Sequence, residues 1–322
     1  MTSDMGEPGG ASAITHRVAP GPVFAHYPAV RAIALAEMAQ IAGGRLPGRR
    51  LAEFVFSLPA SVLARSLVAL DRDLAGASLR LAALAALRRF GVDPALELAA
   101  GAVPIRLLDA GETPLPRRGP LLVVANHPGL FDALALFAAA DRDDLVTLAA
   151  RRPLFEALPN LRRRLLAIDP GAAGGLALRH ALRHLRRGGA VLHFPAGRIE
   201  PDPSVTPRGA PLLQPWKPGL GLLLAAAARS CPDLRVATAL VSGVISPRAL
   251  AVAGALGRTL GLTDALVPLI QLTFPGFGDA AVRVRFGPAE PVDRAAGDAA
   301  PRLRARIEAM ATTAAAQTAA AW

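Results

Sequence analysis

The sequence predicts an α/β protein with a mixed or mainly parallel sheet flanked by helices and with an N-terminal helical segment. After residue 100, short apolar runs of strand length alternate with stretches of helical character, which is the pattern of strands joined by crossover helices. Before residue 100, apolar residues recur at helical spacings instead. Hydrophobic residues make up 52% of the 322 positions, enough for a sizeable core. The chain therefore divides into a tail at 1–22, a helical segment at 23–99, an α/β domain at 100–295 and a C-terminal helix at 296–322.

The first 22 residues are polar, rich in glycine and contain prolines, so we expect a disordered tail. They lack the basic start and apolar run of a secretory signal. In the segment at 23–99, apolar residues fall three and four positions apart, as a one-sided helix requires: Phe54, Leu58, Val62, Leu63 and Leu67. A further helix is predicted at Leu79–Arg89. Two interpretations stay open: the helices pack on the main domain, or they form an amphipathic surface that enters a membrane interface.

Seven apolar runs after residue 100 have strand length and are partly β-branched: Val103–Leu108, Leu121–Ala125, Leu145–Leu148, Leu165–Ile168, Val191–Phe194, Val236–Val241 and Val282–Phe286. Between the fourth and fifth runs lies a clear helix, which Gly188 and Gly189 end as a left-handed cap would. Strand, helix and strand at this spacing predict a parallel crossover. An alanine-rich helix near Ala299 to Ala320 closes the chain.

The chain is strongly basic, with a formal net charge of +11, and Lys217 is its only lysine. Nucleic acid is one candidate partner for such a chain, but aromatic residues are only 4%, so platforms for base stacking are scarce. Anionic lipid head groups are a second candidate, because the planar arginine fork suits phosphate. A merely solubilising surface charge is the third. We expect an anionic membrane surface and no nucleic acid.

No stretch approaches the roughly 18 uninterrupted apolar residues that a membrane-spanning helix needs. Cys231 is the single cysteine, which excludes an internal disulfide and fits a reducing compartment. We therefore expect a cytoplasmic protein that is peripheral on the inner face of the cell membrane. We also expect no metal site: His180 and His184 stand at i and i+4 on a helix, but four arginines surround them and would repel a cation.

The stretch from Leu121 to Asp132 is the most informative in the chain. A buried strand is predicted to run into a turn, with Pro128 at the first position of a helix. His127 would then lie at the carboxyl end of a sheet strand, where α/β proteins bind ligands. Because a helix N-terminus disfavours an imidazolium, we expect His127 to stay neutral. Asp132 can reach back to the other ring nitrogen and fix the orientation of the imidazole.

Two blocks in this order resemble a known family. Asn126 and His127, followed by four residues and Asp132, resemble the first motif (HX4D) of the glycerol-phosphate and lysophosphatidate acyltransferases. The run His193-Phe194-Pro195-Ala196-Gly197-Arg198-Ile199-Glu200 is similar to the Phe-Pro-Glu-Gly-Thr-Arg block of that family. Softer similarities to the family lie in the segments Ala150–Leu154, Lys217–Gly221 and Val241–Gly243. The resemblance covers about residues 100 to 290, so the α/β domain is identified as an acyltransferase domain.

The resemblance implies an O-acyltransferase of phospholipid biosynthesis, like 1-acylglycerol-3-phosphate acyltransferase. A fatty acyl group would pass from acyl-CoA or acyl carrier protein, as co-substrate, to a hydroxyl of a lysophospholipid or glycerol phosphate, with no other cofactor. His127 would be the general base and Asp132 its carboxylate, and backbone amides near Gly197 would bind the developing oxyanion. The implied substrate-binding residues are Asn126, Arg151, Phe194, Pro195, Gly197, Arg198 and Glu200.

The second block departs from the family pattern. Ala196 stands in place of the glutamate, and Arg198 falls one position before the family arginine, where this chain has Ile199. These departures leave the acceptor open and favour one alternative function, a non-catalytic lipid-binding or membrane protein that retains the fold. The intact motif around His127 argues for catalysis.

Overall fold

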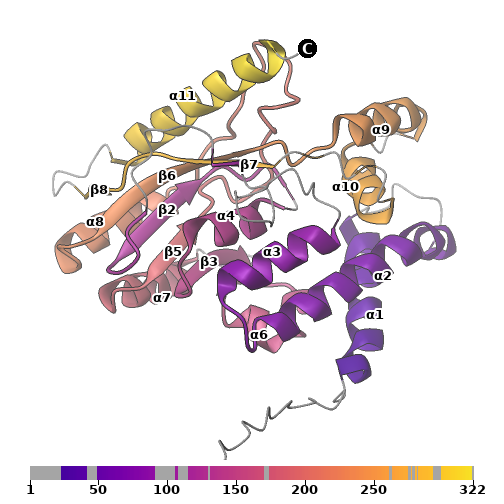
Figure 1. Ribbon diagram of the computed structural model, residues 1–322, viewed down its shortest axis with the longest axis horizontal. Helices are drawn as coiled ribbons and strands as arrows, with labels where there is room; N and C mark the ends of the chain where they lie inside the picture. The colour runs from indigo at the N-terminus through magenta and orange to yellow at the C-terminus, as the bar shows by residue number, and fades with distance from the viewer. Residues whose placement is uncertain are drawn as a thin grey trace, which may run out of the picture.

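The computed structural model describes residues 23–41, 49–90, 106–107, 115–129, 131–169, 174–260, 263–274, 277, 280, 282–292 and 299–320. Within these residues, one eight-stranded sheet runs through the middle of the molecule, with helices on both of its faces (Figure 1). The expected tail at 1–22 lies outside the described residues. The division into four parts at the expected boundaries stays a prediction.

The sheet is mixed but mainly parallel, as predicted. The strand order is β1-β7-β6-β2-β5-β3-β4, and β8 pairs with β6 beside this path. Strands β4, β3, β5, β2 and β6 form a parallel series, whereas β6 pairs antiparallel with β7 and β8. The strand bounds are β1 (Arg106–Leu107), β2 (Leu121–Ala125), β3 (Leu145–Ala150), β4 (Leu165–Ile168), β5 (Ala190–His193), β6 (Arg235–Ser242), β7 (Arg283–Phe286) and β8 (Glu290–Pro291).

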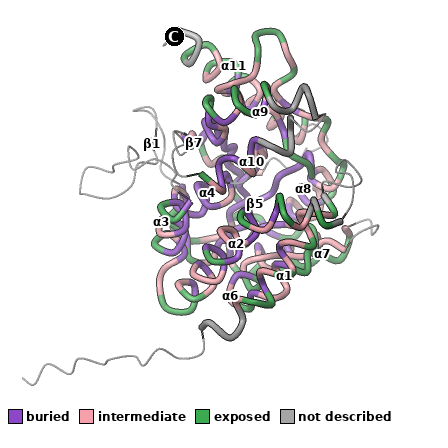
Figure 2. The backbone as a smooth tube through the Cα atoms, turned by 90° about the vertical axis from the view of Figure 1, so that its right-hand side faces the viewer, coloured by how far each residue is buried: buried purple, intermediate pink, exposed green. Residues whose placement is uncertain are grey.

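The central strands read as continuous apolar runs because both faces of the sheet are covered. All five residues of β2 are buried. Leu121, Val123 and Ala125 join the core on one face, whereas Leu122 and Val124 join the core on the other. All four residues of β5 are buried, and Figure 2 shows the strand among helices in this view. The first core is covered by α1 (Val23–Ile41), α2 (Arg49–Asp73), α3 (Leu79–Arg89) and α4 (Asp132–Ala140), and the second by α7 (Gly175–Arg186), α8 (Gly219–Ser230) and α11 (Ala299–Ala320).

The N-terminal helices pack on the main domain through small residues. Ala60 and Ala64 of α2 and Ala34 of α1 are fully buried, and their small side chains let the helix axes approach closely. The spacing had placed Phe54 and Leu58 on the same helix face as Leu67. That interpretation is wrong, because Phe54 is 81% and Leu58 is 56% exposed. The buried face of α2 is instead formed by Ala60 and Ala64 together with Phe56, Leu67 and Leu70.

Two further helices follow β6 as a hairpin that the periodicity did not predict, α9 (Pro247–Leu260) and α10 (Thr263–Thr273). They share a small core of their own, formed by Ala249, Ala253, Val267 and Ile270. The hairpin projects from the sheet and packs beside α2 (Figure 1). The short helices α5 (Pro153–Glu156) and α6 (Pro159–Arg162) complete the described helical elements.

Candidate active site

His127 follows β2, at the carboxyl end of a central strand. Its Nδ1 lies 2.6 Å from Oδ2 of Asp132, whose side chain is 1% exposed, whereas that of His127 is 29% exposed. An ionised carboxylate only accepts hydrogen bonds, so Nδ1 carries the proton and Nε2 is the acceptor in the neutral ring. The sequence predicted that Asp132 reaches back to this ring, and the structure brings the two side chains together.

The turn between His127 and Asp132 is longer than predicted. Helix α4 begins at Asp132, so the expectation that Pro128 occupies the first helical position is wrong. Gly129 has a φ of +148°, which takes the chain out of helical conformation where other residues would be strained. The N–H of Gly129 donates to Oδ2 of Asp132 at 3.0 Å. One carboxylate oxygen therefore holds both the turn and the imidazole.

A reciprocal pair of hydrogen bonds joins His127 to Glu200. The backbone N–H of His127 donates to Oε2 of Glu200 at 2.9 Å, and the backbone N–H of Glu200 donates to the carbonyl of His127 at 2.7 Å. The other carboxylate oxygen, Oε1, accepts the N–H of Gln214 at 2.9 Å. Because Glu200 is only 2% exposed, it does not face a substrate. The substrate-binding role expected for Glu200 stays a prediction; in the structure its carboxylate holds the His127 main chain.

Phe194 brings the second sequence block against the imidazole. Its ring stacks on that of His127, with centroids 4.6 Å apart and planes at 25°. Phe194 is buried, so its ring packs against the imidazole from the protein interior and leaves little of its own surface for contact with a substrate.

Gly197 occupies a tight turn beside this ring stack. It has a φ of +61°, and its N–H donates to the carbonyl of Phe194 at 3.1 Å. The N–H of Gly197 is thus already used, and the expectation that backbone amides near Gly197 bind an oxyanion stays a prediction. A Cβ at Gly197 would lie 2.9 Å from Nζ of Lys217. The backbone N–H of Lys217 bonds the carbonyl of the buried Pro195 at 2.9 Å. The only lysine of the chain therefore lies across this turn.

Asn126 ties the catalytic turn to the neighbouring strand β6. Its Nδ2 donates to the carbonyl of Val241 at 2.8 Å, and its Oδ1 accepts the N–H of Val241 at 2.7 Å. The side chain is fully buried. The expected substrate contact of Asn126 stays a prediction; in the structure its amide continues the hydrogen bonding between β2 and β6 at the point where the chain leaves β2.

The two arginines predicted to bind substrate differ in their surroundings. Arg151 donates from Nε to Asp169 and from Nη1 to Glu156 at 2.8 Å, so two carboxylates already engage its guanidinium. Arg198 is exposed on the same loop as Gly197, and its side chain makes no hydrogen bond or ion pair with the described part of the chain. Arg198 is thus the better-placed cation for an anionic ligand.

The charges around His127 shift its pKa upwards. Burial alone would lower the pKa of the imidazole, but the hydrogen bond and charge of Asp132, with the charge of Glu200, outweigh that effect. The helix N-terminus was expected to disfavour the imidazolium; the pKa instead shifts upwards, because Asp132 and Glu200 favour the charged ring and α4 begins only at Asp132. Burial raises the pKa of the Glu200 carboxyl, against the two N–H groups and the charge of His127.

Other histidines lie apart from this chemistry. His193 is buried, neither ring nitrogen has a hydrogen-bond partner among the described residues, and burial lowers its pKa to about 4. It remains neutral at physiological pH. His184, considered and set aside as a metal ligand, bonds the carbonyl of Asp144 through Nε2 at 2.7 Å.

Asp202 is a structural residue that sequence reasoning missed. It is 1% exposed, and its carboxylate accepts the N–H groups of Ser204, Gly243 and Ile245, each at 2.9 Å. It therefore joins the loop that carries Glu200 to the end of β6. Sequence reasoning missed this role because Gly243 and Ile245 lie 41 and 43 positions away in sequence.

Comparison with known proteins agrees with the family resemblance of the two sequence blocks, the motif from Asn126 to Asp132 and the block from His193 to Glu200. Residues 106–239 match the family model described as acyltransferase. No curated protein sequence matches the chain significantly. The crystal structure of the 1-acyl-sn-glycerophosphate (LPA) acyltransferase PlsC from Thermotoga maritima is similar over 94% of this chain and 96% of that chain, with 15% sequence identity and a TM-score of 0.41. Residues 106–239 therefore carry a domain of the acyltransferase family, and the resemblance drawn from the two blocks is confirmed.

Proposed function

We propose that this protein transfers a fatty acyl group from an acyl thioester to a hydroxyl of a lysophospholipid or glycerol-phosphate acceptor. The acyltransferase family match supports the reaction class. The single observation that carries the assignment of residues is the hydrogen bond of 2.6 Å between His127 Nδ1 and Asp132 Oδ2. The buried carboxylate holds a part-exposed imidazole with Nε2 available to a ligand.

The geometry supports general-base catalysis without an acyl-enzyme. Nε2 of His127 takes the proton of the acceptor hydroxyl as its oxygen attacks the thioester carbonyl, and Asp132 stabilises the imidazolium that forms. When the tetrahedral intermediate collapses, the carbon–sulfur bond breaks and the ester remains. The proton then passes from His127 to the thiolate, so the products are an ester and a free thiol. A thioester is already activated towards attack, and we propose no cofactor beyond acyl-CoA or acyl carrier protein.

The acceptor phosphate has candidate partners on the loop of the second block. The exposed Arg198 and the ammonium of Lys217, which lies across Gly197, place two cations on the loop whose Phe194 stacks on His127. A phosphate held there would be bound by charge-assisted hydrogen bonds. In this proposal Arg198 and Lys217 replace the interactions that the family glutamate and arginine would make in the positions held here by Ala196 and Ile199.

We further propose that the protein works at the cytoplasmic face of the cell membrane. Among the described helices, the segment Glu53–Asp73 is long and apolar enough to cross a membrane by length and composition, although part of it is buried in the core. The net charge of +11 would attract an anionic leaflet, by about 1 kcal/mol for each basic residue near the surface. The expectation that no stretch approaches a spanning helix is thus not met by this segment, but core helices pass the same test, and we propose the peripheral location that the charge favours.

The test is a coupled assay of the purified protein with a long-chain acyl-CoA and a panel of lysolipids and glycerol phosphate. Free thiol and acylated lipid are measured together, and acyl carrier protein replaces CoA in a second series. We expect both products with one acceptor class, and a loss of about 10²–10⁴-fold in His127→Ala. His180→Ala, which removes an exposed histidine of α7, is the matched control and should keep full activity.

Two outcomes would overturn the proposal. Undiminished transfer in His127→Ala would exclude this histidine as the base. Absence of both products with either donor, while vesicles still bind the wild type and His127→Ala equally, would favour the non-catalytic lipid-binding protein.

A further inference from the structure

Large hydrophobic side chains are exposed mainly at one end of the molecule. Of the nine that stand exposed in the described part of the chain, five lie on α2, on α9 or directly after α10. Figure 1 shows these helices gathered on one side, away from α7 and α8. We call this surface the apolar end, and its members are Phe54, Val55, Leu58, Val252 and Phe274.

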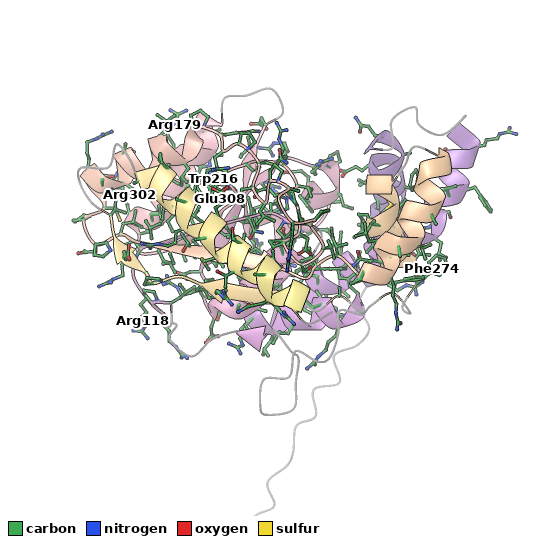
Figure 3. All side chains as sticks on the ribbon, turned by 90° about the horizontal axis from the view of Figure 1, so that it is seen from above. Arg118, Arg179, Trp216, Phe274, Arg302 and Glu308 are labelled. Atoms are coloured by element: carbon green, nitrogen blue, oxygen red, sulfur yellow. The ribbon has the colours of Figure 1, made fainter. Side chains whose placement is uncertain are left out.

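The α9–α10 hairpin has the apolar composition of an element that is transferred from water to an apolar environment. Its 28 residues from Pro247 to Phe274 include only three charged side chains, Arg248, Arg258 and Asp264. Phe274 is 52% exposed and stands on the part of the molecule formed by the hairpin, well away from α11 (Figure 3). Helix α10 packs against both α9 and α2, and exposed apolar side chains that gather on packed helices mark a protein or membrane contact.

The charges beside the apolar end favour an anionic lipid surface as the contact. On α2, Phe54 and Leu58 are four positions apart, and exposed arginines precede and follow them on the same helix, Arg50 and Arg65. Arginine can bury its aliphatic stem against apolar surface while the guanidinium stays at the phosphate level. An apolar stripe between two arginines therefore fits the boundary between acyl chains and anionic head groups.

The root of the hairpin is fixed to the loops around His127. Asp202 accepts the N–H groups of Gly243 and Ile245, just before α9 begins. The side chain of Gln271 on α10 donates to the carbonyl of Val244 at 3.0 Å. Asp202 lies two residues beyond Glu200, whose carboxylate holds the His127 main chain. Contact made by the hairpin is thus linked through a short, buried network to the position of the catalytic turn.

We propose that the α9–α10 hairpin is a membrane-docking element that acts together with α2, and that Phe274 and Val252 enter an anionic bilayer surface. This surface goes beyond the amphipathic N-terminal segment, because it joins helices almost 200 positions apart in sequence. It rests on the proposed membrane location but not on the proposed chemistry. In this proposal the hairpin orients the molecule so that the carboxyl end of β2, where His127 lies, faces the membrane. Lipid acceptors then reach His127 without leaving the membrane.

The test is co-sedimentation of the purified full chain with vesicles of phosphatidylcholine alone and of phosphatidylcholine with phosphatidylglycerol. Burying a phenylalanine side chain favours binding enough that Phe274→Ser should weaken partitioning to anionic vesicles about tenfold. Val252→Ser should weaken it less, and Phe54→Ser about as much as Phe274→Ser. The matched control is Leu222→Ser on α8, because Leu222 is 65% exposed but lies at the other end of the molecule.

The outcomes separate the docking surface from the chemistry. Equal partitioning of Phe274→Ser and the wild type, or an equal loss in Leu222→Ser, would overturn the proposal. A loss in Phe54→Ser alone would restrict docking to α2 and also overturn it. Acyl transfer to a short-chain acceptor that is soluble as a monomer should be unchanged in Phe274→Ser. Vesicle binding that survives in a protein with no transferase activity would refute the proposed function while supporting the docking element.

Discussion

Glu200→Gln tests whether the buried carboxylate positions the catalytic turn. In the wild type, its two oxygens accept the N–H groups of His127 and Gln214, each at 2.9 Å. A hydrogen bond to a charged group contributes about 1.5–3 kcal/mol. Glutamine keeps the shape but offers one acceptor oxygen, so one bond is weakened and one N–H faces an amide nitrogen. The neutral amide avoids the cost of burying a charge, and we expect a net loss of about 1–3 kcal/mol in the free energy of unfolding.

The same substitution should reduce catalysis through geometry. When a reactive group is displaced by about 1 Å, the rate can fall roughly 100-fold, and we expect kcat to drop roughly tenfold to 100-fold. The charge of Glu200 helps to raise the pKa of His127, so the acid limb of the pH–rate profile should move to lower pH. Urea unfolding, steady-state thiol release and a pH series measure the three effects.

Glu156→Gln is the control, because Glu156 is partly exposed and pairs with Arg151 at the surface. It should change the free energy of unfolding by less than about 0.5 kcal/mol. If Glu200→Gln behaves like this control in stability, kcat and pH profile, then the hydrogen bond from the His127 N–H to the Glu200 carboxylate has no role in positioning the turn.

Two further substitutions probe the site. In the wild type, activity should rise with pH through a pKa above the usual value for histidine, since only neutral His127 accepts a proton. Asp132→Asn removes the charge that raises this pKa, so kcat should fall about 10²–10⁴-fold. The acid limb of the residual activity should move to lower pH. A pH–rate series in which the acid limb does not move would contradict the pairing of Asp132 with His127. Asn126→Ala leaves the N–H and carbonyl of Val241 unpaired beside β2, at a cost of about 2–4 kcal/mol for two buried groups, and a urea midpoint equal to that of the wild type would refute the structural role.

The sequence predicted the sheet well because buried parallel strands leave a strong signal. Leu121–Ala125 and Leu165–Ile168 have the predicted bounds, and the predicted helix Ala299–Ala320 also matches. The Gly188 cap was recognised because glycine readily takes its φ of +84°. The pairing of His127 with Asp132 followed from their short separation in sequence.

The remaining features depend on contacts between distant residues. Nothing local indicates that Glu200 bonds His127, 73 positions earlier, or that Asn126 is used by β6. The face of α2 was misassigned because the buried positions include Ala60 and Ala64, whose side chains give little hydrophobic signal, whereas Phe54 and Leu58 are exposed. The start of α4 was misplaced because Pro128 fits a first helical position, whereas Gly129 keeps the turn open.

The position of β2 has a consequence for the order of folding. β2 lies between β5 and β6, both of which are synthesised after it, and Asn126 bonds a residue 115 positions further along the chain. Contacts of such sequence separation form slowly, because the intervening loop must close first. The histidine turn is therefore completed only when β6 is in place. During refolding, amide protons of β2 should become protected from exchange together with those of β6. Catalytic activity should therefore return only when both strands have joined the sheet.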